Sequence, residues 1–146
     1  MIQQPISIMT GKPVLPDMAQ DVVDFHHKFK IGYEGKPRLL DEKTASFRGA
    51  RGLEEVHEWI DAHATSDLEG CLDAIVDEIY ILLGTAHLQG FTPDRIAEAW
   101  RRVHTANMQK ELCSPTNPGK YGALGDKLDI VKPSGWKAPD LSDLVQ

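Results

Sequence analysis

Apolar residues recur at helical spacing in four successive segments, and this feature limits the fold more than any other. The segments cover about residues 17–30, 41–63, 68–89 and 93–112. Side chains three or four positions apart share one face of an α-helix, so each segment is predicted to be an amphipathic helix. No stretch of useful length alternates between apolar and polar residues, which argues against a β domain. The predicted fold class is therefore all-α, a bundle of about four main helices.

Residues that begin or end helices separate these segments. Ser66–Asp67 supplies an N-cap for the third helix, and Gly90 is a natural stop after it. Thr92 caps the fourth helix, and Pro93 takes its first position, where a proline needs no partner for its nitrogen. The helical core is predicted to span residues 17–112, after an irregular, proline-containing lead-in.

The composition changes after Leu112, because the last 34 residues hold four prolines and four glycines. Two interpretations stay open for residues 113–146. One is a disordered tail, a state in which proline and glycine are common. The other is an ordered but irregular arm, anchored by Trp136 and Leu141, that packs on the helices or on another subunit. In either case residues 1–146 are interpreted as one domain with a C-terminal extension.

Charge and composition exclude several classes of function. The net charge of −6 makes a wide binding surface for a nucleic acid polymer improbable. The sequence contains no run of eighteen apolar residues, so no membrane span is predicted. Met1–Lys12 lacks the apolar core of a secretory signal. Cys71 and Cys113 lie far apart, as expected of free thiols in a reducing compartment. We therefore expect a cytoplasmic protein.

Carboxylates gather on the second and third predicted helices. Glu54, Glu55 and Glu58 share one side of the second helix, because residues four apart differ by only about 40° around the axis. Glu69, Asp73 and Asp77 follow one another at the same spacing on the third helix. If the two helices pair antiparallel, the clusters converge and repel unless a divalent cation such as Mg²⁺ or Mn²⁺ neutralises them. The alternative is an ordinary solvated acidic face.

Other residue patterns are less informative. The six histidines include no H-E-x-x-H pair and no ligand triad of the right types, so no zinc site is predicted. No nucleophile motif indicates covalent catalysis. Lys28, Arg48, Arg51 and Lys110 are basic candidates for binding phosphate groups, and Arg51 lies on the Glu54 side of its helix. The predicted chemistry is therefore metal-assisted.

Several ordered motifs resemble those of a known family, over about residues 17–141. They are the segments DVVDFHHKF (21–29), RGLEEVHE (51–58), LDAIVDEIYILLGTA (72–86), VHTANMQK (103–110) and KPSGWKAPDL (132–141). The set resembles the MazG-like all-α nucleoside triphosphate pyrophosphohydrolases, and most closely their phosphoribosyl-ATP pyrophosphohydrolase-like branch. The resemblance implies a MazG-like helical bundle that hydrolyses nucleotides between the α- and β-phosphates, giving a monophosphate and pyrophosphate.

The resemblance also implies the acids of the site. The family's E-E-x-x-E block maps onto Glu54, Glu55 and Glu58. Its E-x-x-D block ends at Asp77, but Ala74 stands where the glutamate is expected, and Asp73 is interpreted as its replacement. Two or three Mg²⁺ or Mn²⁺ ions per site would be held by Glu54, Glu55, Glu58, Asp73 and Asp77. Glu55, or its neighbour Glu54, would orient or deprotonate the attacking water.

Further implications concern the substrate and the assembly. Lys28, Arg51, Asn107 and Lys110 are candidate substrate contacts, and a homodimer or homotetramer is expected. A phage branch called MazZ-like cleaves dGTP or GTP, so a purine triphosphate is expected with these two favoured, in the host cytoplasm if the chain is phage-encoded. The alternatives are phosphoribosyl-ATP, a house-cleaning role on modified dNTPs, and a non-catalytic helical interaction module.

Overall fold

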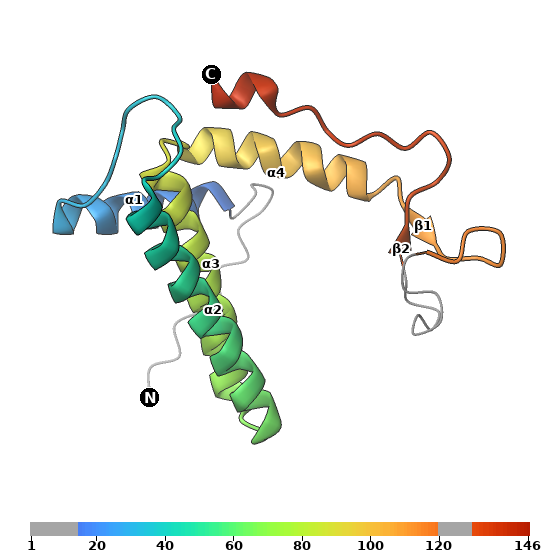
Figure 1. Cartoon of the computed structure of the whole chain (residues 1–146), viewed down its shortest axis with the longest axis horizontal. Helices are drawn as coiled ribbons and strands as arrows, with labels where there is room; N and C mark the ends of the chain where they lie inside the picture. Colours follow the sequence, from blue (N-terminus) through green and yellow to red (C-terminus); the bar gives the residue numbers. More distant parts are fainter. Residues whose placement is uncertain (1–14, 120–129) are drawn as a thin grey trace, which may run out of the picture. The chain divides into compact units, whose positions relative to one another are not determined.

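The computed structural model describes residues 15–119 and 130–146, and helices dominate them (Figure 1). Its helices are α1 (Leu15–Phe29), α2 (Glu42–Ala64), α3 (Leu68–Leu88) and α4 (Pro93–Asn107). They confirm the predicted all-α fold with four main helices. The shorter elements are β1 (Glu111–Leu112), β2 (Ile130–Val131) and a 3₁₀ turn, η1 (Ser142–Val145). Most of the proline-containing lead-in and positions 120–129 of the predicted arm lie outside the described residues.

The chain divides into two compact units between Ile96 and Ala97. The boundary falls within the first turn of α4, so that most of this helix belongs to the second unit. The interpretation of residues 1–146 as a single domain stays a prediction.

An antiparallel helical hairpin of α2 and α3 forms the larger part of the first unit (Figure 1). The Asp41 carboxylate accepts a hydrogen bond from the Thr44 backbone N–H and starts α2. The Asp67 carboxylate accepts one from the Gly70 N–H and starts α3, as its predicted N-cap role requires. Only Thr65–Asp67 separate the two helices, so the chain reverses tightly.

Helix α1 packs against α3 and completes the core of this unit. Ala19, Val22 and Leu83 form a buried apolar cluster, with Met18 and Ile96 packed beside it. Beyond the cluster, the Phe25 ring meets the Tyr80 ring edge-on, with 5.5 Å between the ring centroids. The predicted apolar face of α1 is therefore buried at Val22 and partly at Met18, whereas Phe25 and Phe29, which share its spacing, remain exposed.

The second unit holds most of α4 and the described part of the C-terminal arm. Helix α4 ends at Asn107, so the prediction that it continues to Leu112 was wrong. The backbone N–H groups of Gln109 and Lys110 donate to the carbonyl oxygens of Ala106 and Asn107, which tightens the last turn and ends the helix. Glu111 and Leu112 instead pair with residues 130–131 as β1 and β2, antiparallel.

The described residues of the arm that follow β2 contact α4. The Trp136 indole N–H donates to the Ala106 carbonyl oxygen at 2.8 Å. The Arg102 guanidinium binds both carboxylate oxygens of Asp143 and also donates to the Asp140 carbonyl oxygen. For residues 130–146 the structure therefore agrees with the ordered, irregular arm. In the described ranges, no helix has both the length and the apolar character needed to cross a membrane.

Candidate active site

The acids predicted on α2 lie on one side of that helix but differ in exposure. Glu55 is only 5% exposed, whereas Glu54 and Glu58 are exposed. Arg51, one turn earlier, forms an ion pair with Glu54 and lies 3.7 Å from the Glu55 carboxylate. The cation predicted to bind phosphate therefore already lies against the acids.

Glu55 is the electrostatic centre of this cluster. Burial raises the pKa of its carboxyl above the usual value, and the negative charges of Glu58 and Asp77 raise it further. The Arg51 guanidinium opposes these effects by lowering the same pKa. Because Asp77 acts on Glu55 from α3, the hairpin brings together acids of both predicted blocks. A cation at this place would relieve their repulsion.

A second acid, Glu78 of α3, faces the same place, and sequence reasoning missed it. Glu55 and Glu78 line one hollow of about 220 Å³. The other residues that line it are Val56, Trp59, Ala74, Ile75 and Ile79. One carboxylate oxygen of each acid, Oε2, is buried without a hydrogen-bond partner. The sequence contained a signal for Glu78. Ala74 stands where the family's glutamate is expected, and Glu78 follows it by four positions, so the two residues share one face of α3.

Asp73 lies elsewhere. It is exposed and lines a different hollow of about 540 Å³, together with Asp67 and Glu69. Its charge is not among those that shift the pKa of Glu55. The structure thus associates Asp77 and Glu78 with Glu55, and the metal-binding role of Asp73 stays a prediction.

The basic and amide candidates are distributed over both units. Lys28 lies near the end of α1, and its Nζ is 5.2 Å from the centroid of the Phe29 ring. Asn107 ends α4, and the Nζ of Lys110 is 5.4 Å from the centroid of the Trp136 ring. Asn107 and Lys110 belong to the second unit. Substrate contacts of these three residues stay predictions.

The chemistry of the donors fits a hard divalent cation. All of the acids offer carboxylate oxygens, which Mg²⁺ and Mn²⁺ prefer. The buried, unpartnered Oε2 of Glu55 is also a group that a folded protein satisfies with a partner. In the described parts of the chain, the α2 and α3 acids do not form a group of three whose ligand oxygens all lie within 4.8 Å of one another.

Comparison with known proteins identifies the family of this chain. A family model described as phosphoribosyl-ATP pyrophosphohydrolase matches residues 22–107, which is more than half of the chain. The match contains the whole of α2 and α3, and with them all the acids of the candidate site. No curated protein sequence matches the chain. The chain belongs to the phosphoribosyl-ATP pyrophosphohydrolase family, within the MazG-like all-α superfamily.

Proposed function

We propose that this chain hydrolyses a purine nucleoside triphosphate, with dGTP and GTP as the first candidates, between the α- and β-phosphates. The family implies a pyrophosphohydrolase that acts on a nucleotide. One observation carries the proposal for this chain. Glu55 lies in the span that the family model matches, and its carboxylate has a buried oxygen without a hydrogen-bond partner. The negative charges of acids on both α2 and α3 raise the pKa of this carboxyl.

Glu55 is the residue that we propose as general base. Its Oε2 has no hydrogen-bond partner, so this oxygen is available to accept a proton from a water molecule. The water oxygen then forms a bond to the α-phosphorus, and the bond from that phosphorus to the α–β bridging oxygen breaks. The products are the nucleoside monophosphate and pyrophosphate. Arg51 lies beside Glu55 and is proposed to bind a phosphate oxygen.

Two or three Mg²⁺ or Mn²⁺ ions are proposed to complete the site. The ligands that we propose for them are Glu54, Glu55, Glu58 and Asp77, with Asp73 from the sequence analysis and Glu78 from the structure as further candidates. When bound, such ions neutralise phosphate charge and lower the pKa of a bound water. The repulsion among these acids supports the proposal, because cation binding would remove it.

A second copy of the chain is proposed to cover the hairpin. Large apolar side chains remain exposed beside the hollow of Glu55 and Glu78, among them Val56 at 42%, Ile75 at 47% and Ile79 at 38% exposure. Burying them in a homodimer or homotetramer would also exclude water from the carboxylates. Sedimentation analysis would test this, since a monomer at all concentrations contradicts it.

Phosphoribosyl-ATP is the second candidate substrate, because the family model carries the name of that activity. The scissile bond is the same, so the acids have the same roles. A modified dNTP and a non-catalytic interaction module are the remaining alternatives. They differ from the main proposal in which compound, if any, releases pyrophosphate.

The test is pyrophosphate release from the eight common NTPs and dNTPs and from phosphoribosyl-ATP, with Mg²⁺ or Mn²⁺ and with chelator. We expect metal-dependent release from dGTP or GTP. Release from phosphoribosyl-ATP alone would favour the second candidate. If every compound stays intact and Mn²⁺ leaves the melting temperature unchanged, the interaction module is favoured, because an ion that binds only the native state must stabilise it.

A further inference from the structure

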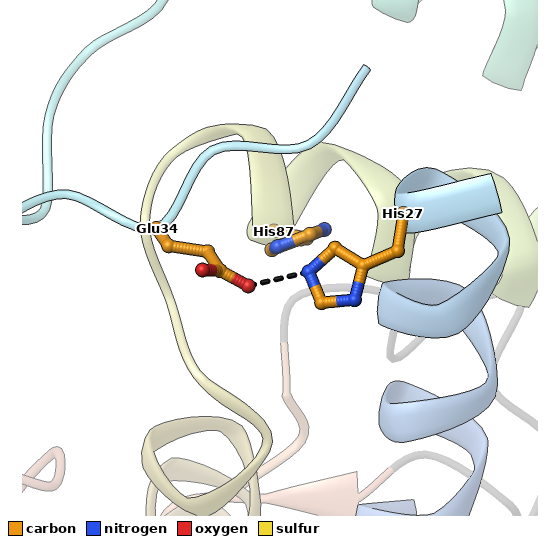
Figure 2. Close-up of side chains that lie close together, drawn as sticks. All are labelled: His27, Glu34 and His87. Atoms are coloured by element: carbon orange, nitrogen blue, oxygen red, sulfur yellow. Dashed lines mark hydrogen bonds and ion pairs between the residues drawn. The ribbon is translucent and has the colours of Figure 1, made fainter. Parts of the chain in front are cut away.

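Three side chains of metal-ligating types converge at the C-terminal end of α3 (Figure 2). None of them lines the hollow of Glu55 and Glu78. They are His27 near the end of α1, Glu34 in the loop before α2, and His87 in the last turn of α3. One ligand atom from each lies within 4.8 Å of the other two. Within the described residues no other His, Cys, Asp and Glu side chains form such a group.

His87 is an independent observation that points to a ligand at this cluster. The residue is 5% exposed, and its Nε2 is buried without a hydrogen-bond partner. The ring also lines a hollow of about 280 Å³, which His27, Glu34 and the aromatic residues Tyr33 and Phe91 border as well. A buried imidazole nitrogen with no partner is costly. A metal ion bound to this nitrogen would satisfy it.

The neighbour of His87 suits a metal-binding imidazole. His87 Nδ1 lies 2.8 Å from Nδ1 of the buried His26, so one of these nitrogens donates to the other. When His87 is the donor, its proton is on Nδ1 and the Nε2 lone pair is free. An outer hydrogen bond of this kind orients metal-binding histidines in proteins. His26 is therefore placed to hold His87 in the ligating tautomer.

We propose that His27, Glu34 and His87 bind one transition-metal dication of the Zn²⁺ class. Two imidazoles and one carboxylate suit Zn²⁺ and its borderline neighbours, whereas Mg²⁺ prefers oxygen ligands and suits the α2 and α3 acids. Three protein ligands leave a fourth position, which the adjoining hollow can supply with water or a small anion. The site is separate from the proposed nucleotide chemistry and does not depend on it.

In the structure as described, His27 Nε2 and Glu34 Oε1 are 2.5 Å apart. Both side chains are exposed, so this contact is an ordinary surface pair. Metal binding would replace it with two coordinate bonds. Because the ligands come from α1, the loop and α3, one ion would fasten the loop to both helices. Zinc binding should therefore raise the melting temperature of the chain.

The experiment is a zinc titration of the full chain, freed of metals and kept in excess Mg²⁺ to occupy the carboxylate site. Equilibrium dialysis with elemental analysis counts bound zinc, and Co²⁺ in its place reports a tetrahedral protein site by its visible absorption. We expect one zinc per chain and a zinc-dependent rise in melting temperature. His27→Gln and Glu34→Gln should each weaken binding by at least about tenfold.

Both substitutions are at exposed positions, so the variants should fold like the parent chain. His104→Gln, an exposed histidine of α4, is the matched control and should bind zinc as tightly as the parent. The proposal is overturned if zinc does not bind in excess Mg²⁺. It is also overturned if His27→Gln and Glu34→Gln bind it as tightly as the control, because the zinc then lies elsewhere.

Discussion

Glu55 of α2 and Glu78 of α3 line the same hollow, and each has a buried carboxylate oxygen without a partner. Carboxylates with a buried, unpartnered oxygen weaken the protein when no cation is present, because that oxygen loses hydration without gaining a hydrogen bond. The two acids therefore lower the stability of the hairpin at the position where the proposed reaction requires carboxylates. The first two predictions follow from this relationship.

Changing Glu55 to glutamine should have opposite effects on stability, which rises, and on turnover, which falls. In chelator the Glu55→Gln variant should melt at a higher temperature than the parent chain, because it removes a buried charge that Glu58 and Asp77 repel. Its turnover should fall by about 10²–10⁴-fold, the contribution usual for a general base. Pyrophosphate release and thermal melting measure the two effects. Glu42→Gln, at an exposed position of α2, is the control. Normal turnover in Glu55→Gln would remove the proposed base.

Two acids of α3 can be compared to find the cation ligand. Glu78→Gln should lose most of the Mn²⁺-dependent rise in melting temperature, because Glu78 shares the hollow with Glu55. Asp73→Asn should keep more of that rise, because Asp73 lines a different hollow. The rise is measured for both variants over the same range of Mn²⁺ concentrations. The opposite ranking would restore Asp73 as the ligand and leave Glu78 a structural residue.

Helical spacing alone predicted the four helices well, because each buries a face whose period appears in the local sequence. The bounds of α3, Leu68–Leu88, agree with the prediction to one residue, since Asp67 fixes the start by capping. The end of α4 was misplaced by five residues. The pairing of Glu111 with Val131 joins segments far apart in the chain, and no local period reports such a contact.

The candidate site was predictable only in part, for a similar reason. Spacing placed Glu54, Glu55 and Glu58 on one side of a helix, but it did not show that Glu55 alone is buried. That difference arises from packing against α3. His27 and His87 lie sixty positions apart in the sequence, so only the fold reveals that they meet. Ligand sets assembled from distant segments leave no spacing motif to find.

Arg48 is predicted to stabilise the hairpin rather than to bind substrate. Its Nε donates to Thr85 Oγ1 at 2.9 Å, and its Nη2 donates to the Ile81 carbonyl oxygen, which fastens α2 to α3. Arg48→Met should reduce the free energy of unfolding by about 1–3 kcal/mol, because both acceptors then lose a charged donor. Lys43→Gln, at an exposed position of α2, should change it by less than about 0.5 kcal/mol. Urea unfolding measures both variants, and equal effects would contradict the assigned role.

The second unit should show an acid-dependent loss of stability that originates at Glu98. Hydrogen bonds from Arg101 and then Arg102 lower the pKa of the Glu98 carboxyl to about 2. A carboxyl with a lowered pKa in the folded state stabilises the fold above its unfolded pKa, near 4.5, and this contribution disappears as the pH falls toward 2. The parent chain should therefore melt above Glu98→Gln at pH 7, by a few degrees at most because the pairs are solvated.

The difference between the two melting temperatures is the quantity to follow. It should stay constant from pH 7 to about pH 5 and shrink below that, since only the parent chain then takes up a proton at this position on unfolding. Glu111→Gln, an exposed acid in β1, should show no such dependence. A difference that stays constant down to pH 3 would mean that the arginines do not hold the Glu98 carboxylate. Arg102 would then hold the arm through Asp143 without support from Glu98.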